Sequence, residues 1–116
     1  MTLAQIAPLL QANIINGPDG FENTVVSHVV ASDLMSDVLV AHAEDFILIT
    51  SLASDQMIRT ADLVGASGVI LVNGKQPHAS LTKLAKELDM PLLGTALPKF
   101  EACLAAGQAL LQETTA

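Results

Sequence analysis

Hydrophobic residues occur along this chain in short runs, and each run is followed by a stretch with helical spacing. Four runs have the character of β-strands, at residues 24–31, 46–50, 69–72 and 92–95. The runs at 46–50 and 69–72 are continuously apolar, which is typical of strands covered on both faces by helices in a parallel sheet. The run at 24–31 is more mixed in polarity, so we expect it nearer an edge of the sheet.

The stretches after these runs place apolar residues three and four positions apart, as amphipathic helices do. Their apolar faces consist of Met35, Val38, Leu39 and His42, then of Met57, Ile58, Ala61 and Val64, then of Leu81, Leu84, Ala85 and Leu88, and finally of Phe100, Cys103, Leu104 and Leu111. Upstream, Thr2 and Gln5 have the spacing of a capping box and predict a first helix. Residues 12–16 are expected to add a short strand before a turn at 16–20. The pattern predicts a three-layer α/β domain with a largely parallel sheet of about 4–5 strands flanked by helices.

Composition narrows the class of protein. The chain has 116 residues, enough for one domain, and 51% of them are hydrophobic, which excludes a disordered chain. A net charge of −7 with only 5 basic residues excludes a protein that tracks nucleic-acid backbones. Because the chain shows no basic leader and no apolar run of about 20 residues, we expect a cytoplasmic protein without a membrane span.

Polar residues gather where the predicted strands end. The carboxyl ends of parallel strands meet at one edge of the sheet, and ligands of open α/β sheets bind there. We call this edge the C-terminal rim. Single Ser, Thr and Asp residues at such positions are explained by helix capping, whereas a group of them also suits a ligand. The candidate ligand-binding residues on the rim are Ser51, Ser54, Asp55, Asn73, Gly74, Lys75 and Thr95.

The loop that begins at Asn73 is the most unusual part of the rim. Asn73 and Gly74 favour positive φ, which would expose successive backbone N–H groups, and Lys75 adds the one positive charge expected on the rim. Such a loop suits a phosphate or a carboxylate. It is not a P-loop, because five residues separate Gly68 from Gly74 and Gln76 stands in place of the Ser or Thr that would meet magnesium.

The sequence supports a catalytic or metal site less than it supports a ligand site on the rim. A carboxylate pair of Asp33 and Asp55 would require their loops to touch, and a small enzyme using Asp55 with His78 is a third, weaker alternative. Cys103 lies at a core-facing helical position and is interpreted as a small hydrophobic residue. No Ser/His/Asp or Cys/His arrangement and no cluster of metal ligands stands out, so we expect no catalytic residues, no metal and no cofactor.

The order of these segments resembles the DRTGG domain family over residues 12–108. The landmarks are residues 15–17, 30–36, 48–50, 54–55, 68–77 and 90–95. Asp55 matches the family's Asp, but Gln56 stands where Arg is expected. Val72, Asn73 and Gly74 replace the Thr-Gly-Gly stretch, so only its last glycine is retained. The family is similar to the N-terminal domain of HPr kinase/phosphorylase and also occurs beside CBS domains in regulated pyrophosphatases.

The resemblance implies a regulatory role, since in multidomain members the chemistry belongs to other domains. We therefore expect residues 1–116 to form a single DRTGG-like domain, a non-enzymatic regulatory and dimerisation module that acts on a separate protein partner or regulated enzyme. A homodimer would also cover apolar surface that a small domain leaves exposed. The alternative is a sensor that binds a nucleotide or another anionic metabolite at the C-terminal rim.

Overall fold

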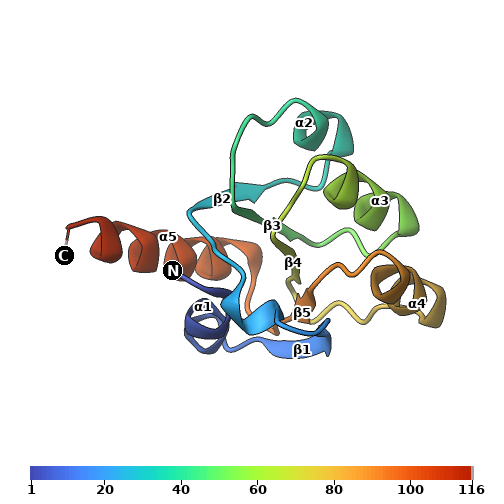
Figure 1. Cartoon of the computed structure of the whole chain (residues 1–116), viewed down its shortest axis with the longest axis horizontal. Coiled ribbons are helices and arrows are strands. Elements are labelled where there is room, and N and C mark those ends of the chain that lie inside the picture. The colour runs from blue at the N-terminus through green and yellow to red at the C-terminus, as the bar shows by residue number, and fades with distance from the viewer. Residues whose placement is uncertain (116) are drawn as a thin grey trace.

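A five-stranded sheet forms the centre of the molecule. The computed structural model describes the backbone of residues 1–115 and the side chains of residues 1–113. The strand order is β1-β5-β4-β3-β2 (Figure 1). The parallel strands are β2 (His28–Ala31), β3 (Phe46–Thr50), β4 (Gly68–Leu71) and β5 (Leu92–Gly94), and β1 (Asn13–Asn16) pairs with β5 in the antiparallel direction. The expected mostly parallel sheet is confirmed.

Helices cover both faces of the sheet. One face carries α2 (Met35–Leu39), α3 (Asp55–Leu63) and α4 (Ala79–Glu87), and the other carries α1 (Leu3–Leu9) and α5 (Lys99–Thr115), with a short 3-10 helix, η1 (Phe21–Asn23), beside α1 (Figure 1). Phe46 and Leu48 of β3 pack towards α2, α3 and α4, whereas Ile47 and Ile49 pack towards α1 and α5. This two-sided burial explains why the run at 46–50 is continuously apolar and confirms the three layers.

The strand predicted at 24–31 is only half correct. The strand begins at His28, and the residues before it leave the sheet to cover the N-terminus. Val26 donates its N–H to the carbonyl oxygen of Met1 (2.7 Å), and Leu3 donates to the carbonyl oxygen of Thr24 (2.9 Å). The mixed polarity of this run therefore reflects two different environments as well as the edge position of β2.

The starts of α1 and α3 are fixed by hydrogen bonds between residues close together in the sequence, as the sequence predicts. The capping box is present, because the Gln5 N–H donates to Thr2 Oγ1 (3.3 Å) and the Thr2 N–H donates to Gln5 Oε1 (2.9 Å). Ser54 caps α3 by accepting the N–H of Met57 (3.2 Å). By contrast, α2 spans five residues, so His42 lies beyond the helix and is exposed rather than part of its apolar face.

The predicted buried face of α5 is wrong. Phe100 is 71% exposed, Leu104 46% and Leu111 68%. The buried side of the helix consists of the small residues Ala102, Ala106 and Ala109. Apolar residues occur around most of this helix, so spacing alone could not identify the buried side. Packing selects the alanines because a helix lies closer to a sheet across small side chains.

Among residues 1–115, no helix is both long enough and apolar enough to cross a membrane. Within the same part of the chain, no three His, Cys, Asp or Glu side chains lie together in a way that could hold a metal ion.

We expect Leu48→Ala to destabilise the fold strongly. Leu48 is fully buried in β3, so its truncation should lower the free energy of unfolding by about 2–5 kcal/mol. Urea denaturation followed by circular dichroism measures this change. Leu63→Ala is the matched control, because Leu63 on α3 is 76% exposed and should change stability by less than about 0.5 kcal/mol. Equal losses in the two variants would contradict the described core.

Candidate functional site

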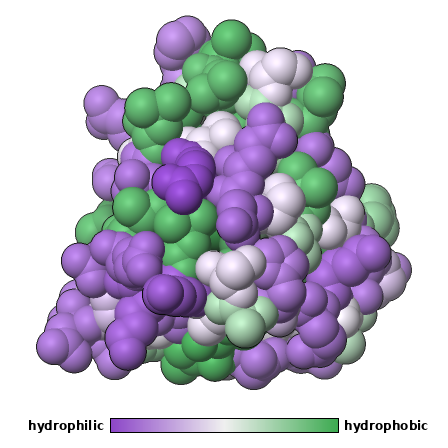
Figure 2. Space-filling view, turned by 90° about the vertical axis from the view of Figure 1, so that its right-hand side faces the viewer, coloured by the Kyte–Doolittle hydropathy of each residue, from purple (hydrophilic) through white to green (hydrophobic). Residues whose placement is uncertain are grey.

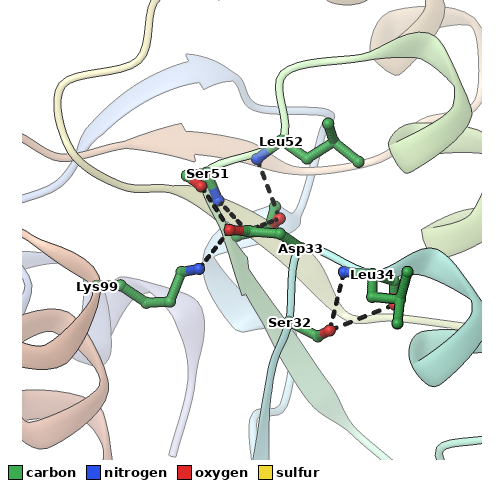
Figure 3. Close-up of polar contacts among 7 residues, drawn as sticks. Ser32, Asp33, Leu34, Ser51, Leu52 and Lys99 are labelled. Atoms are coloured by element: carbon green, nitrogen blue, oxygen red, sulfur yellow. Dashed lines mark hydrogen bonds and ion pairs between the residues drawn. The ribbon is translucent and has the colours of Figure 1, made fainter.

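Asp33 is the most highly connected side chain of the C-terminal rim. Its Oδ1 accepts hydrogen bonds from Thr50 Oγ1 (2.9 Å) and from the backbone N–H of Ser51 (2.7 Å). Its Oδ2 accepts from Ser51 Oγ (2.7 Å) and from Lys99 Nζ (2.5 Å) (Figure 3). The carboxylate therefore joins the chain after β2 to the end of β3 and to the first residue of α5.

This arrangement sets the charge state of Asp33. Partial burial opposes ionisation, but the Lys99 ammonium group and the hydrogen bonds from Ser51 and Thr50 more than offset it. Together they hold the pKa of the Asp33 carboxyl well below its usual range. Lys99 was missed as a rim residue, and Lys75 is therefore not the only positive charge there. The available signal was the position of Lys99 directly after Pro98, at the start of the helix that follows β5.

Cys103 lies one helical turn beyond Lys99. Burial raises the pKa of its thiol, and the nearby Lys99 charge opposes this change only in part. The side chain is partly buried and packs against the core between the sheet and α1. A neutral, packed thiol agrees with its interpretation as a small hydrophobic residue.

Asp55 and His78 face each other across the starts of α3 and α4. His78 caps α4, since its Nδ1 accepts the N–H of Leu81 (3.2 Å), and Ser80 Oγ lies 2.7 Å from the same nitrogen. An accepting Nδ1 leaves the proton of a neutral imidazole on Nε2, which lies 4.0 Å from Asp55 Oδ1. That oxygen is buried and has no hydrogen-bond partner within the described residues. Asp33 and Asp55 thus have different neighbours, a lysine ammonium group beside Asp33 and an imidazole beside Asp55.

The loop after β4 has the expected backbone conformation but a different use for its N–H groups. Asn73 (φ 61°) and Gly74 (φ 66°) both adopt the left-handed region. Their N–H groups donate to the carbonyl oxygens of Leu97 (2.8 Å) and Thr95 (3.0 Å), respectively. These two N–H groups fasten the loop to the segment after β5, so the expectation that the loop presents them to an anion is wrong.

A small pocket of about 140 Å³ lies beside this loop. Its lining residues are Asn13, Ile15, Gly74, Lys75, Gln76, Gly94, Thr95 and Ala96. The Thr95 hydroxyl donates to the carbonyl oxygen of Leu10 (2.7 Å) and accepts the N–H of Leu97 (3.1 Å), so it is already engaged. Of the seven candidate residues, Gly74, Lys75 and Thr95 thus line one pocket. Ser51 directly follows β3, and Ser54 and Asp55 lie at the start of α3; none of these three residues lines the pocket. Asn73, directly before Gly74, does not line the pocket either.

A larger cavity of about 810 Å³ lies at the opposite edge of the sheet. It is bounded by the turn at residues 16–21, by the connection from α3 to β4 and by the connection from α4 to β5. Its charged lining residues are Asp19, Asp62, Lys86 and Asp89. Sequence reasoning missed this cavity because three distant segments form it at the amino ends of the strands, where no ligand was expected.

The sequence matches the DRTGG domain over residues 5–109. This chain belongs to the DRTGG domain family. Asp55 lies at the start of α3, after β3, and residues 72–74 follow the last residue of the neighbouring strand β4.

A solved structure with the same fold combines CBS and DRTGG domains. It is the crystal structure of the regulatory region of Clostridium perfringens pyrophosphatase, complexed with the activator diadenosine tetraphosphate. The TM-score is 0.77 at 20% sequence identity, with 94% of this chain and 47% of that chain covered. This chain therefore spans about half the length of that structure, and at this identity the likeness concerns the fold. No curated protein sequence matches the chain.

We expect Asp33→Asn to lower the free energy of unfolding at neutral pH. The side chain is 41% exposed, so solvent screens part of the interaction, and a loss of about 1 kcal/mol is expected. The pKa of Asp33 is lower in the folded state than the unfolded value of about 3.9. The stabilisation is therefore complete above about pH 4 and is lost as the pH falls through the folded pKa.

Urea unfolding of the wild type and of Asp33→Asn at pH 7 and pH 3 measures this difference. The gap in stability between the two proteins should narrow at pH 3. Asp62→Asn removes an exposed carboxylate of α3 and serves as the control. A gap for Asp33→Asn that is equal at the two pH values would contradict the described ion pair.

Proposed function

We propose that this chain, taken as one domain over residues 1–116, is a non-enzymatic regulatory module that forms a homodimer and acts on a separate protein. Family membership supports a regulatory role, and the similar structure is the regulatory region of a pyrophosphatase. The observation that carries the proposal is that polar side chains of the C-terminal rim have structural roles within the protein. Asp33, Ser54, His78 and Thr95 all serve as hydrogen-bond acceptors or donors that hold loops and helix starts in place.

The composition of the surface supports association with another protein, either a second copy of this chain or a separate partner. Large apolar side chains are exposed on several elements of this small domain, including Leu34, Leu39 and Val40 around α2. In Figure 2, hydrophobic side chains gather at the top of the molecule, where α2 lies in Figure 1, whereas hydrophilic side chains cover much of the remaining face. Contiguous apolar surface on a small domain is typical of a surface that another protein covers.

Sedimentation velocity on the full chain tests the proposed assembly. We expect the average mass to rise from that of a monomer towards that of a dimer as the concentration increases from about 1 to about 500 µM, the range in which weak interfaces associate. A mass of 12.1 kDa at every concentration would contradict the homodimer.

The second candidate function is a sensor of anionic metabolites at the rim pocket. The pocket's volume of about 140 Å³ is below the ~300–1,000 Å³ of typical small-molecule sites, so it suits one phosphate or carboxylate group rather than a whole nucleotide. Lys75 lines this pocket and is exposed, so its ammonium group is available to such an anion. The remainder of a nucleotide would lie outside the pocket.

A thermal-shift titration with adenine and guanine nucleotides and phosphorylated metabolites tests the sensor. A ligand at one hundred times its dissociation constant stabilises the native state by about 2.7 kcal/mol, which for a domain of this size is a shift on the order of 10 °C. We expect Lys75→Ala to abolish the shift and Lys83→Ala, an exposed lysine of α4, to retain it. A shift retained in Lys75→Ala would contradict this site, and no shift in the wild type would contradict the sensor.

A further inference from the structure

The outer side of α5 is apolar and exposed along three turns of the helix. Phe100, Leu104, Gly107 and Leu111 follow one another at intervals of four, three and four residues, so they lie on one side of the helix. We call these four residues the α5 stripe. The alanines that pack on the sheet lie on the opposite side, and the helix extends past the end of the sheet (Figure 1).

We propose that the α5 stripe is the surface on which a second copy of this chain docks, with the two α5 helices packed antiparallel. The inference rests on the homodimer proposed above and specifies its interface.

The shape of the α5 stripe fits a copy of itself. In an antiparallel pair centred between residues 105 and 106, Phe100 of one copy meets Leu111 of the other, and Leu104 meets Gly107. A twofold interface requires this kind of self-complementarity, because each contact occurs twice. A Cβ atom built on Gly107 would have no atom within 4 Å apart from the neighbouring residues and backbone of its own helix, so Gly107 leaves an open position for the side chain of Leu104. Large residues thus oppose large ones at the ends, and large oppose small in the middle.

Charge favours a second copy as the occupant and sets the direction. The chain carries a net charge of −7, so two copies repel each other over most of their surfaces. Residues 102–112 contain no charged side chain, which makes this part of α5 a surface where a like-charged copy can approach. An antiparallel pair sets the two helix dipoles in opposite directions, which favours it over a parallel pair.

The size of the α5 stripe determines how tightly the copies bind. Three large apolar side chains on each copy bury on the order of 600 Å² in total. A stable complex buries at least about 1,200 Å². An interface built on this stripe is therefore reversible, and monomer and dimer should exchange with concentration rather than form a permanent dimer.

Gly107→Glu is the decisive variant. The substitution replaces the poorest ordinary helix former by a good one, and its Cβ lies in open space, so the monomer should fold at least as well as the wild type. In the dimer, the new carboxylate would occupy the position taken by Leu104 of the second copy. Leu63→Glu introduces the same charge at a well-exposed position of α3 and is the matched control. Leu111→Glu tests the end of the stripe independently.

Sedimentation equilibrium on the full chain and its variants provides the readout, with circular dichroism and urea unfolding to confirm the fold. We expect Gly107→Glu and Leu111→Glu to raise the dimer dissociation constant at least tenfold and Leu63→Glu to change it less than threefold. A wild-type dimer that Gly107→Glu leaves intact would overturn this interface while leaving the homodimer standing. A wild type that stays monomeric would overturn both proposals.

Discussion

The burial of β3 and β4 on both faces is the constraint on which the rest of the structure depends. Every residue of Phe46–Thr50 and Gly68–Leu71 is buried, and the two strands are parallel neighbours. Parallel neighbours need crossover connections, and two buried faces need helices on each side. The carboxyl ends of four strands are thereby brought to one rim, where the backbone changes direction and polar groups lose part of their contact with water.

Those polar groups explain how the rim is built. Asp33 receives hydrogen bonds from Thr50, Ser51 and Lys99, and the Asn73–Gly74 turn donates its N–H groups to the segment after β5. Partly buried polar groups are costly when unpaired, so each internal hydrogen bond also stabilises the fold. The same residues that suggest a ligand site by type are therefore largely engaged within the protein, and Lys75 is left as the exposed charge beside a small pocket.

The sequence predicts the parts of this structure that depend on local or strongly periodic signals. The strand at 46–50 has its predicted bounds, and the Thr2–Gln5 capping box forms as its spacing indicates. The errors arise where a residue pairs with a segment that is far away along the chain. Residues 24–26 pair with the N-terminus rather than with β3, and the N–H groups of the Asn73 loop donate to carbonyl oxygens more than 20 residues away along the chain. Lys99 pairs with Asp33 across 66 residues, a contact that no spacing rule could reveal.

The misassigned face of α5 has a physical reason that also bears on assembly. An amphipathic helix of a monomer shows one apolar side, and its period then identifies the core. In α5 the alanines pack on the sheet, whereas Phe100, Leu104 and Leu111 lie on the opposite side. Two sides of the helix are therefore apolar, and the spacing of the larger side chains indicates the outer side instead of the buried one. A helix that is apolar on both sides is typical of one buried between two layers. The first layer is the sheet of its own chain, and the neutral, self-complementary outer side has the properties of a surface that meets a second copy.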